Sequence, residues 1–275
     1  MEGSATLQGR LWGGAAHTWA ELREPLAAPL WQAMLDAAGV SPGARLLDAG
    51  CGSGGASLLA AQRGALVNGL DASDALLAIA RRRVPDGDFR VGDLEILPYA
   101  DSTFDVVLAA DVLPYTARPA VVLGELARVS RRGASVVVAI GVRPDPTQQA
   151  IILALREVMA AGCAGPEPFA LAEPGILEAL VAGAGLRVLG TDEVRCPWEY
   201  ADRETAWQAY ASTGPLQAAM RLLGQAPVRA VVLRALVPHA TAAGTVRLVS
   251  HFRYVVAAAH RQGEQGRGGE RPDLQ

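Results

Sequence analysis

The stretch Leu46-Leu47-Asp48-Ala49-Gly50-Cys51-Gly52-Ser53-Gly54-Gly55 decides the fold of this chain. Its apolar first residues predict a buried strand, and its glycines predict a tight loop ahead of a helix. Such a loop lets a ligand lie against bare backbone and the helix N-terminus. Gly50, Gly52 and Gly55 also have the spacing of the dinucleotide fingerprint G-x-G-x-x-G. The loop therefore predicts a ligand site and leaves the ligand open.

Short apolar runs alternate with longer amphipathic segments downstream of this loop. We expect strands over 45–48, 66–70, 88–91, 104–110 and 134–142, and helices over 25–38, 56–63, 74–83 and 118–130. Val- and Leu-rich strands separated by helices indicate a parallel sheet that is covered on both faces. With two later strands over 186–194 and 246–258, the fold class is α/β: a doubly wound, mostly parallel seven-stranded sheet of Rossmann-like type.

The pattern becomes more helical after residue 144. Helices are expected over 147–160 and 173–184, and helical residues over 201–243 are interrupted at Gly214-Pro215 and Pro227. A helical cap inserted between the last two strands would cover the ligand edge of the sheet. We expect an N-terminal helical segment over 1–41 that covers the ligand, and an α/β core over 42–200. A helical cap is expected over 201–245, a final core strand over 246–260, and a disordered Gly-, Arg- and Glu-rich tail over 261–275.

Composition narrows the class of protein. The chain has 275 residues, 51% of them apolar and 5% aromatic, so a folded core is expected. All 25 basic residues are arginines, and the net charge of −3 argues against a nucleic-acid partner. The runs Arg81–Arg83 and Arg131–Arg132 stand where helices are expected to end, where cations complement the helix dipole.

Cysteines, histidines and the N-terminus exclude further classes. The three cysteines are far apart and form no C-x-x-C pair, so neither a disulfide framework nor a zinc site is expected. No histidine pair has metal-ligand spacing, so we expect no metal. The N-terminus lacks a signal-peptide pattern, and no apolar run reaches the roughly 18 residues of a membrane span. We therefore expect a cytoplasmic bacterial protein without a membrane partner, monomeric or homodimeric.

Two acids narrow the choice of ligand. Asp71 ends the second expected strand, where the ribose of a nucleotide-like ligand would meet a carboxylate. Asp48 precedes the glycines, where it would repel a pyrophosphate but attract the ammonium group of S-adenosylmethionine. The alternative is that Asp48 only bonds the amides of the loop.

Three segments together resemble the class I S-adenosylmethionine-dependent methyltransferases, and among them the small-molecule type 11 subgroup. Residues 47–54 are similar to motif I of that family, and residues 69–73 to the ribose-binding end of its second strand. Residues 92–107 are similar to its segment running into the fourth strand. The resemblance implies S-adenosylmethionine as cofactor and S-adenosylhomocysteine as product.

The resemblance also implies which residues bind the cofactor. Asp48 and the loop backbone would hold the methionine end, Asp71 the ribose hydroxyls, and Asp93 the adenine amino group. The full expected set is Trp19, Asp48, Gly50, Cys51, Gly52, Gly54, Asp71, Ala72, Asp93, Leu94 and Ala110. The alternative for Asp93 is an ordinary turn acid.

Methyl transfer from a sulfonium is an in-line displacement, so the protein mainly aligns the reactants and excludes water. A general base helps only when the acceptor atom must lose a proton. The candidate catalytic residues are His17, Asp111 and His239. Each has a purely structural alternative.

Aromatic residues gather outside the core: all five tryptophans lie outside residues 42–197. They would form an apolar wall for a substrate, or else only pack the cap. The candidate substrate contacts are Trp12, Tyr115, Trp198, Tyr200 and Trp207.

The leading hypothesis is methyl transfer to oxygen, nitrogen or carbon of a small molecule such as a secondary metabolite. One alternative binds the same cofactor but catalyses a non-methylating reaction, such as a decarboxylation or ring closure. Others are an NAD-dependent reductase and a non-enzymatic binding partner.

Overall fold

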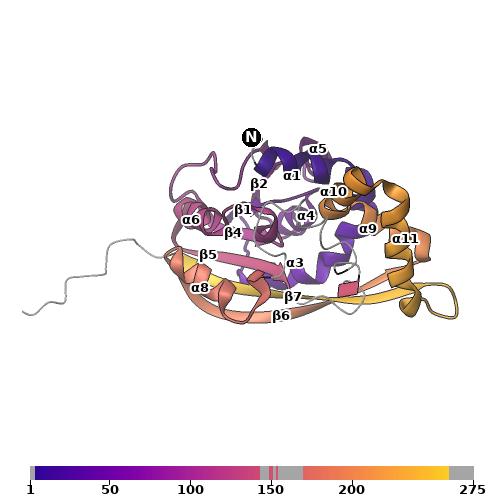
Figure 1. Ribbon diagram of the computed structural model, residues 1–275. Coiled ribbons are helices and arrows are strands. Elements are labelled where there is room, and N and C mark those ends of the chain that lie inside the picture. Colours follow the sequence, from indigo (N-terminus) through magenta and orange to yellow (C-terminus); the bar gives the residue numbers. More distant parts are fainter. Residues whose placement is uncertain (1–3, 143–148, 151–152, 154–169, 260–275) are drawn as a thin grey trace, which may run out of the picture.

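The computed structural model describes residues 4–142, 149–150, 153 and 170–259 (Figure 1). The helix expected over 147–160 falls largely outside these residues, and the tail 261–275 falls entirely outside them. No helix in the described ranges is long and apolar enough to cross a membrane.

One seven-stranded sheet organises the molecule, with strand order β3-β2-β1-β4-β5-β7-β6. The first five strands are mutually parallel, and β7 runs antiparallel to both of its neighbours. This confirms the doubly wound, mostly parallel seven-stranded fold. The strands are β1 (Arg45–Ala49), β2 (Leu66–Asp71), β3 (Asp88–Val91), β4 (Phe104–Ala110), β5 (Ser130–Gly141), β6 (Leu186–Tyr200) and β7 (Val246–Ala259).

Helices cover both faces of this sheet. One apolar layer joins the sheet to α3, α4 and α5, and the other joins it to α6 and α8. Within the core, the helices are α4 (Gly55–Gln62), α5 (Asp74–Arg83), α6 (Pro119–Val129) and α8 (Ile176–Gly183), with 3-10 turns η3 (Leu113–Tyr115) and η4 (Ala170–Ala172). Ser73 caps α5, because its hydroxyl accepts from the Leu76 amide.

Two further groups of helices complete the described structure. The N-terminal group comprises α1 (Ser4–Gly13), α2 (Ala16–Thr18), the π-helix η1 (Trp19–Arg23), the 3-10 helix η2 (Glu24–Ala27) and α3 (Ala28–Ala37). The other group lies between β6 and β7 and comprises α9 (Arg203–Ala211), α10 (Gly214–Leu223), α11 (Gln225–Leu236) and η5 (Val237–His239). The groups meet where α1 packs on α10 and where η1 packs on α9.

The strands β6 and β7 pair with each other beyond the point where β5 ends. We expected the first of them to end at residue 194, but pairing with β7 continues to Tyr200. Burial alternates along the added residues, with Cys196, Trp198 and Tyr200 facing inward. Figure 1 shows β6 and β7 running past the end of β5 toward α9 and α11. The extension carries two aromatic rings out to the helical cap.

Two local expectations were wrong. The second break in the cap lies at Gly224, not at Pro227, which sits in the first turn of α11, where a missing N–H breaks no helical hydrogen bond. Arg131 and Arg132 do not end a helix, because α6 stops at Val129 and both arginines lie in β5. Arg131 instead forms an ion pair with Asp105 of the neighbouring strand β4.

Candidate functional site

The glycine loop folds back onto the end of β2. The amides of Gly50 and Cys51 both donate to the carbonyl of Leu70, at 2.7 and 3.1 Å. Gly50 has a φ of +77°, and a Cβ placed on it would lie 2.3 Å from Cγ1 of Val112. Only glycine meets both conditions, so the loop and the segment after β4 can approach each other closely.

Asp71 joins this loop to the start of α5. Its Oδ2 accepts from the Gly52 amide at 2.9 Å, and its Oδ1 accepts from the Ser73 amide at 2.8 Å. Burial raises the pKa of Asp71, and these backbone hydrogen bonds oppose that rise. The result is a carboxylate fixed in position at the carboxyl end of β2.

The segment after β3 supplies another fixed acid. Asp93 Oδ1 accepts from the Glu95 amide at 2.9 Å, which closes a tight turn. Glu95 is itself buried and accepts from both the backbone amide and the side chain of Arg118. These bonds hold the Asp93–Leu94 turn against the sheet edge.

Asp111 lies just after β4 in an unusual backbone conformation. Its φ is +55°, a left-handed value that is costly for a residue with a side chain. Its Oδ1 accepts from the Gly141 amide at 3.0 Å, which ties it to the end of β5. Burial raises the pKa of Asp111 to about 6, while the Gly141 hydrogen bond and the charge of Arg23 act against that rise.

The N-terminal helices are clamped onto the glycine loop by a buried ion pair. Glu24 accepts from the amide and the hydroxyl of Ser53 and pairs with the guanidinium of Arg83. Arg83 also donates to the carbonyls of Ser53 and Ala20, both at 3.0 Å. Arg83 thus ends its helix as expected, but its main contacts join three distant segments.

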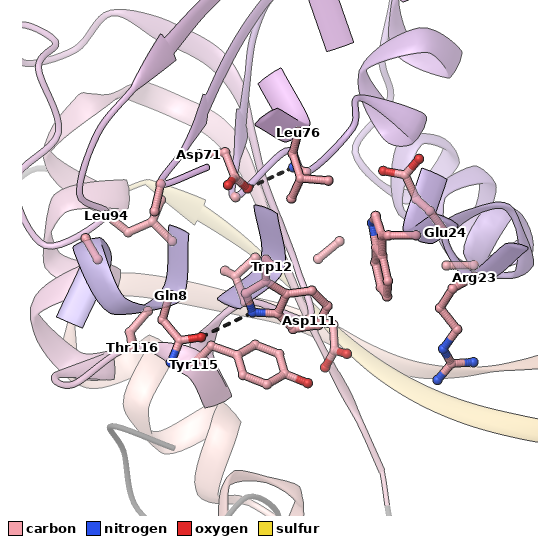
Figure 2. Close-up of a pocket in the computed structure, with 18 of the residues that line it drawn as sticks. Gln8, Trp12, Arg23, Glu24, Asp71, Leu76, Leu94, Asp111, Tyr115 and Thr116 are labelled. Atoms are coloured by element: carbon pink, nitrogen blue, oxygen red, sulfur yellow. Dashed lines mark hydrogen bonds between the residues drawn. The ribbon is translucent and has the colours of Figure 1, made fainter. Parts of the chain in front are cut away.

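These segments enclose one cavity at the carboxyl edge of β1, β2 and β4, with about 1150 Å³ of empty space including its open mouth. Figure 2 shows residues from both sides of it, with Asp71 and Leu94 from the core and Gln8, Trp12, Arg23 and Glu24 from the N-terminal helices. Trp12 makes edge-on ring contacts with Trp19 and Tyr115, at centroid distances of 4.9 and 5.1 Å. Trp198 and Phe252, from β6 and β7, also line the cavity.

Most of the residues expected at the site do line this cavity. The structure brings together Trp12, Trp19, Gly50, Gly52, Asp71, Ala72, Asp93, Leu94, Ala110, Asp111, Tyr115 and Trp198.

Other expected residues lie elsewhere. His17 is exposed on α2, and His239 is half-buried in η5. Tyr200 and Trp207 are buried beside the cap rather than at the cavity. The described geometry therefore brings neither histidine into the cavity wall.

Three motif residues lie beneath the loop instead of in the cavity. Asp48 is 1% exposed, and its Oδ2 accepts from the Ser57 hydroxyl at 2.7 Å. Burial raises its pKa to about 6. Cys51 is also buried, and Gly54 has a φ of +84° where α5 packs closely on the loop. In the structure these residues support the loop rather than face the cavity.

The sequence interpretation overlooked several lining residues, including Gln8, Arg23, Glu24, Trp31 and Phe252. A signal for most of them was present. Ser4, Gln8 and Trp12 follow a spacing of four, as do Trp19, Arg23, Ala27 and Trp31, and all seven line the cavity. Four-residue spacing places side chains on one face of a helix. Nothing local marks Phe252, which reaches the cavity through strand pairing.

Comparison with known proteins agrees with this geometry. Residues 47–138 match a family model described as a methyltransferase domain. The chain is 41% identical over 106 residues to a demethylmenaquinone methyltransferase of Renibacterium salmoninarum, covering 38% of this chain and 45% of that protein. The chain spans about half the length of the curated relatives it matches.

Solved structures share the whole fold at lower identity. The [4+2]-cyclase SpnF is 22% identical with a TM-score of 0.57, over 85% of this chain and 82% of that one. A geranyl diphosphate methyltransferase in complex with S-adenosylmethionine is 18% identical with a TM-score of 0.54, over 90% of each chain. At these identities the likeness shows the fold alone. Among the described residues no cluster of His, Cys, Asp or Glu could hold a metal ion.

Proposed function

We propose that this chain is an enzyme that uses S-adenosylmethionine to methylate a small-molecule acceptor, because residues 47–138 match a methyltransferase domain. The observation that carries the proposal is the single cavity shared by the glycine loop, Asp71, Asp93 and Asp111. The domain match favours this activity over a nicotinamide-dependent reductase.

The chemistry of the core half of the cavity fits S-adenosylmethionine. The ligand is a cation with a ribose diol and an adenine, and this half offers fixed carboxylates and bare glycine backbone. Asp71 would accept from the ribose hydroxyls, and Asp93 with the Leu94 amide would meet the adenine. Gly50 and Gly52 would lie against the methionine end. When bound, the cofactor supplies an electrophilic methyl group to the acceptor.

The chain's own residues then align the acceptor and take its proton. Asp111 Oδ1 is engaged by the Gly141 amide, which leaves Oδ2 without a hydrogen bond among the described residues. A hydroxyl acceptor would lose its proton to this oxygen as the new bond to carbon forms, whereas an ammonium would lose its proton before the free amine attacks the methyl group. The aromatic side chains from the N-terminal helices and from β6 would exclude water from the reacting atoms.

Calorimetry with S-adenosylhomocysteine tests the cofactor half of the proposal. We expect the full chain to bind it, and Asp71→Ala to weaken binding about 100-fold through loss of a charged hydrogen-bond acceptor. Asp74→Ala is the matched control, because Asp74 is an exposed acid three residues away that pairs with Arg81. Absence of binding at about millimolar ligand would overturn the proposal.

Mass spectrometry of reactions with candidate acceptors tests the transfer itself. Methyl transfer predicts one S-adenosylhomocysteine for each acceptor that gains a methyl group. Acceptor turnover without S-adenosylhomocysteine would replace this proposal with the non-methylating alternative.

A further inference from the structure

Arg23 occupies a distinctive place in the cavity wall. Its guanidinium carbon lies 3.5 Å from the centroid of the Trp198 ring and 5.2 Å from that of Tyr210. It is the only cation among the cavity-lining residues that the structure describes, whereas Glu24, Asp71, Asp93 and Asp111 are acids of the same wall. Asp71 and Asp93 lie on the side of β2 and β3, whereas Arg23 lies against Trp198 of β6, and we call these two parts the acidic end and the positive end of the cavity.

The donors of Arg23 are little used. A guanidinium carries five N–H donors, but within the described ranges Arg23 makes one long hydrogen bond, 3.4 Å from Nη1 to the Tyr200 hydroxyl, and forms no ion pair. Arg83, at the end of α5, shows the contrast, because it is bonded to Glu24, Ser53 and Ala20. Arg83 is built to hold the fold, whereas Arg23 retains donors for a ligand.

Aromatic packing holds Arg23 in place without neutralising it. The Trp198 side chain is 4% exposed, and its ring supports the guanidinium through a cation–π contact. In the view of Figure 2, the Asp111 carboxylate lies between the ring of Tyr115 and the guanidinium of Arg23. An oriented guanidinium presents a planar fork of donors, which matches the two oxygens of a carboxylate.

The position of this cation separates it from the cofactor. Asp71 ends β2 and Asp93 follows β3. Trp198 and Phe252 come from β6 and β7 at the other end of the sheet. Asp111 lies between the two, bonded to the end of β5. A cationic cofactor fits the acidic end, so the positive end is left for the acceptor.

We propose that the acceptor is a planar conjugated molecule bearing a carboxylate, and that Arg23 binds that carboxylate while the methyl-accepting atom faces Asp111. The aromatic rings of Trp12, Tyr115 and Phe252 supply the surfaces for the planar framework. This inference rests on the proposed function, since it assigns the cofactor to the opposite end.

Calorimetry with matched probes tests it. The full chain, saturated with S-adenosylhomocysteine, is titrated with 2-naphthoate and with its neutral analogue 2-naphthamide. We expect naphthoate to bind about tenfold more tightly, the difference that a charge-assisted pair gives in a partly buried site. Arg23→Gln should weaken naphthoate binding about tenfold and leave naphthamide within about twofold. Arg23→Lys keeps the charge but loses the planar fork of donors, so its naphthoate affinity should lie between those of the wild type and Arg23→Gln.

The control variant is Arg229→Gln, which removes the same charge from an exposed pair with Glu204 on the cap. It should leave both probes unchanged, and S-adenosylhomocysteine affinity should be retained in every variant, which reports that each is folded. Equal binding of the two probes, no binding of naphthoate, or an equal loss in Arg229→Gln would overturn the inference. If S-adenosylhomocysteine itself does not bind, the proposed function fails. Titration of the ligand-free chain with the same probes then still reports on Arg23.

Discussion

The two ends of the cavity are built in different ways. The acidic end is made of loops at the carboxyl edge of β1 to β4, and its side chains are fixed by backbone amides nearby in sequence. Asp71, for example, accepts from amides 2 and 19 residues away. The cationic end is made of side chains from remote segments, and Arg23 meets a hydroxyl 177 residues away. Backbone hydrogen bonds make the acidic end rigid. The cationic end is held by ring packing, so substitution of a few side chains can change its shape and charge.

This difference suggests a division of labour. A ligand that many proteins share is best bound by a site built on backbone groups, because side-chain substitutions leave backbone amides in place. A ligand peculiar to one protein is best met by side chains. The following experiments test whether the two ends respond as differently as their construction indicates.

The largest effect is expected from Gly50→Ala. Its new Cβ would lie 2.3 Å from Val112 at a φ of +77°, so we expect a loss of about 3 kcal/mol in stability and about 100-fold in S-adenosylhomocysteine affinity. Gly133→Ala is the matched control, since Gly133 has the same φ with no atom within 4 Å. It should cost about 1 kcal/mol of left-handed strain and leave affinity unchanged. Equal affinity losses in the two variants would contradict a rigid backbone cradle.

A comparable loss of stability is expected from Glu24→Gln, which breaks the link between the two ends. The change leaves the Arg83 charge without its buried partner, so denaturant unfolding should show a loss of about 3 kcal/mol. Glu199→Gln, which breaks an exposed pair with Arg247, should cost less than about 0.5 kcal/mol. If both variants lose the same small amount, the clamp does not stabilise the N-terminal helices.

An effect of opposite sign, which disappears at low pH, is expected from Asp111→Asn. The folded protein holds the pKa of Asp111 at about 6, above its ordinary value, so the folded state binds more protons than the unfolded state between about pH 4 and pH 6. The contribution of Asp111 to stability is therefore present below about pH 4 and is lost as pH rises through 6. Asparagine cannot ionise, so the variant should gain about 3 kcal/mol over the wild type at pH 7 and almost nothing at pH 4.

Denaturant unfolding at several pH values checks this expectation. Asp74→Asn, at an exposed acid, serves as control and should track the wild type at every pH. A gain that does not vary with pH would show that the effect comes from packing and not from ionisation. Asp111→Asn should also lose the proton-accepting step, so this variant should be more stable but less active than the wild type.

The smallest effect is a spectroscopic one. Four tryptophans line the cavity, namely Trp12, Trp19, Trp31 and Trp198, and Trp207 is buried away from it. S-adenosylhomocysteine should change the tryptophan emission of the wild type, and Trp19→Phe should reduce that change, since the Trp19 indole lies next to Gly52. Trp207→Phe should leave the change intact. If S-adenosylhomocysteine leaves the tryptophan emission of the wild type unchanged, the rings only pack the helices.

The sequence by itself determined the sheet, the glycine loop and the acids that end β2 and β3. These features follow from local rules: alternating apolar runs define the strands, and glycines are required where backbone must pass close to other atoms. It also predicted that the tryptophans outside the core would gather at the cofactor edge, and four of the five line the cavity.

Tertiary structure alone decided the rest. Asp48 belongs to the most recognisable motif of the sequence. In the structure its carboxylate points into the protein and accepts from the Ser57 hydroxyl, an orientation that only the packing of strand and helix determines. The sequence interpretation named Asp111 and two histidines as catalytic candidates. Of these three, the structure brings Asp111 into the cavity, together with Arg23, which lies 88 residues away along the chain. The extension of β6 and the pairing of Phe252 depend on contacts between distant strands. Local propensity determines which elements form, but the charge and shape of the acceptor end depend on which distant side chains the fold brings together.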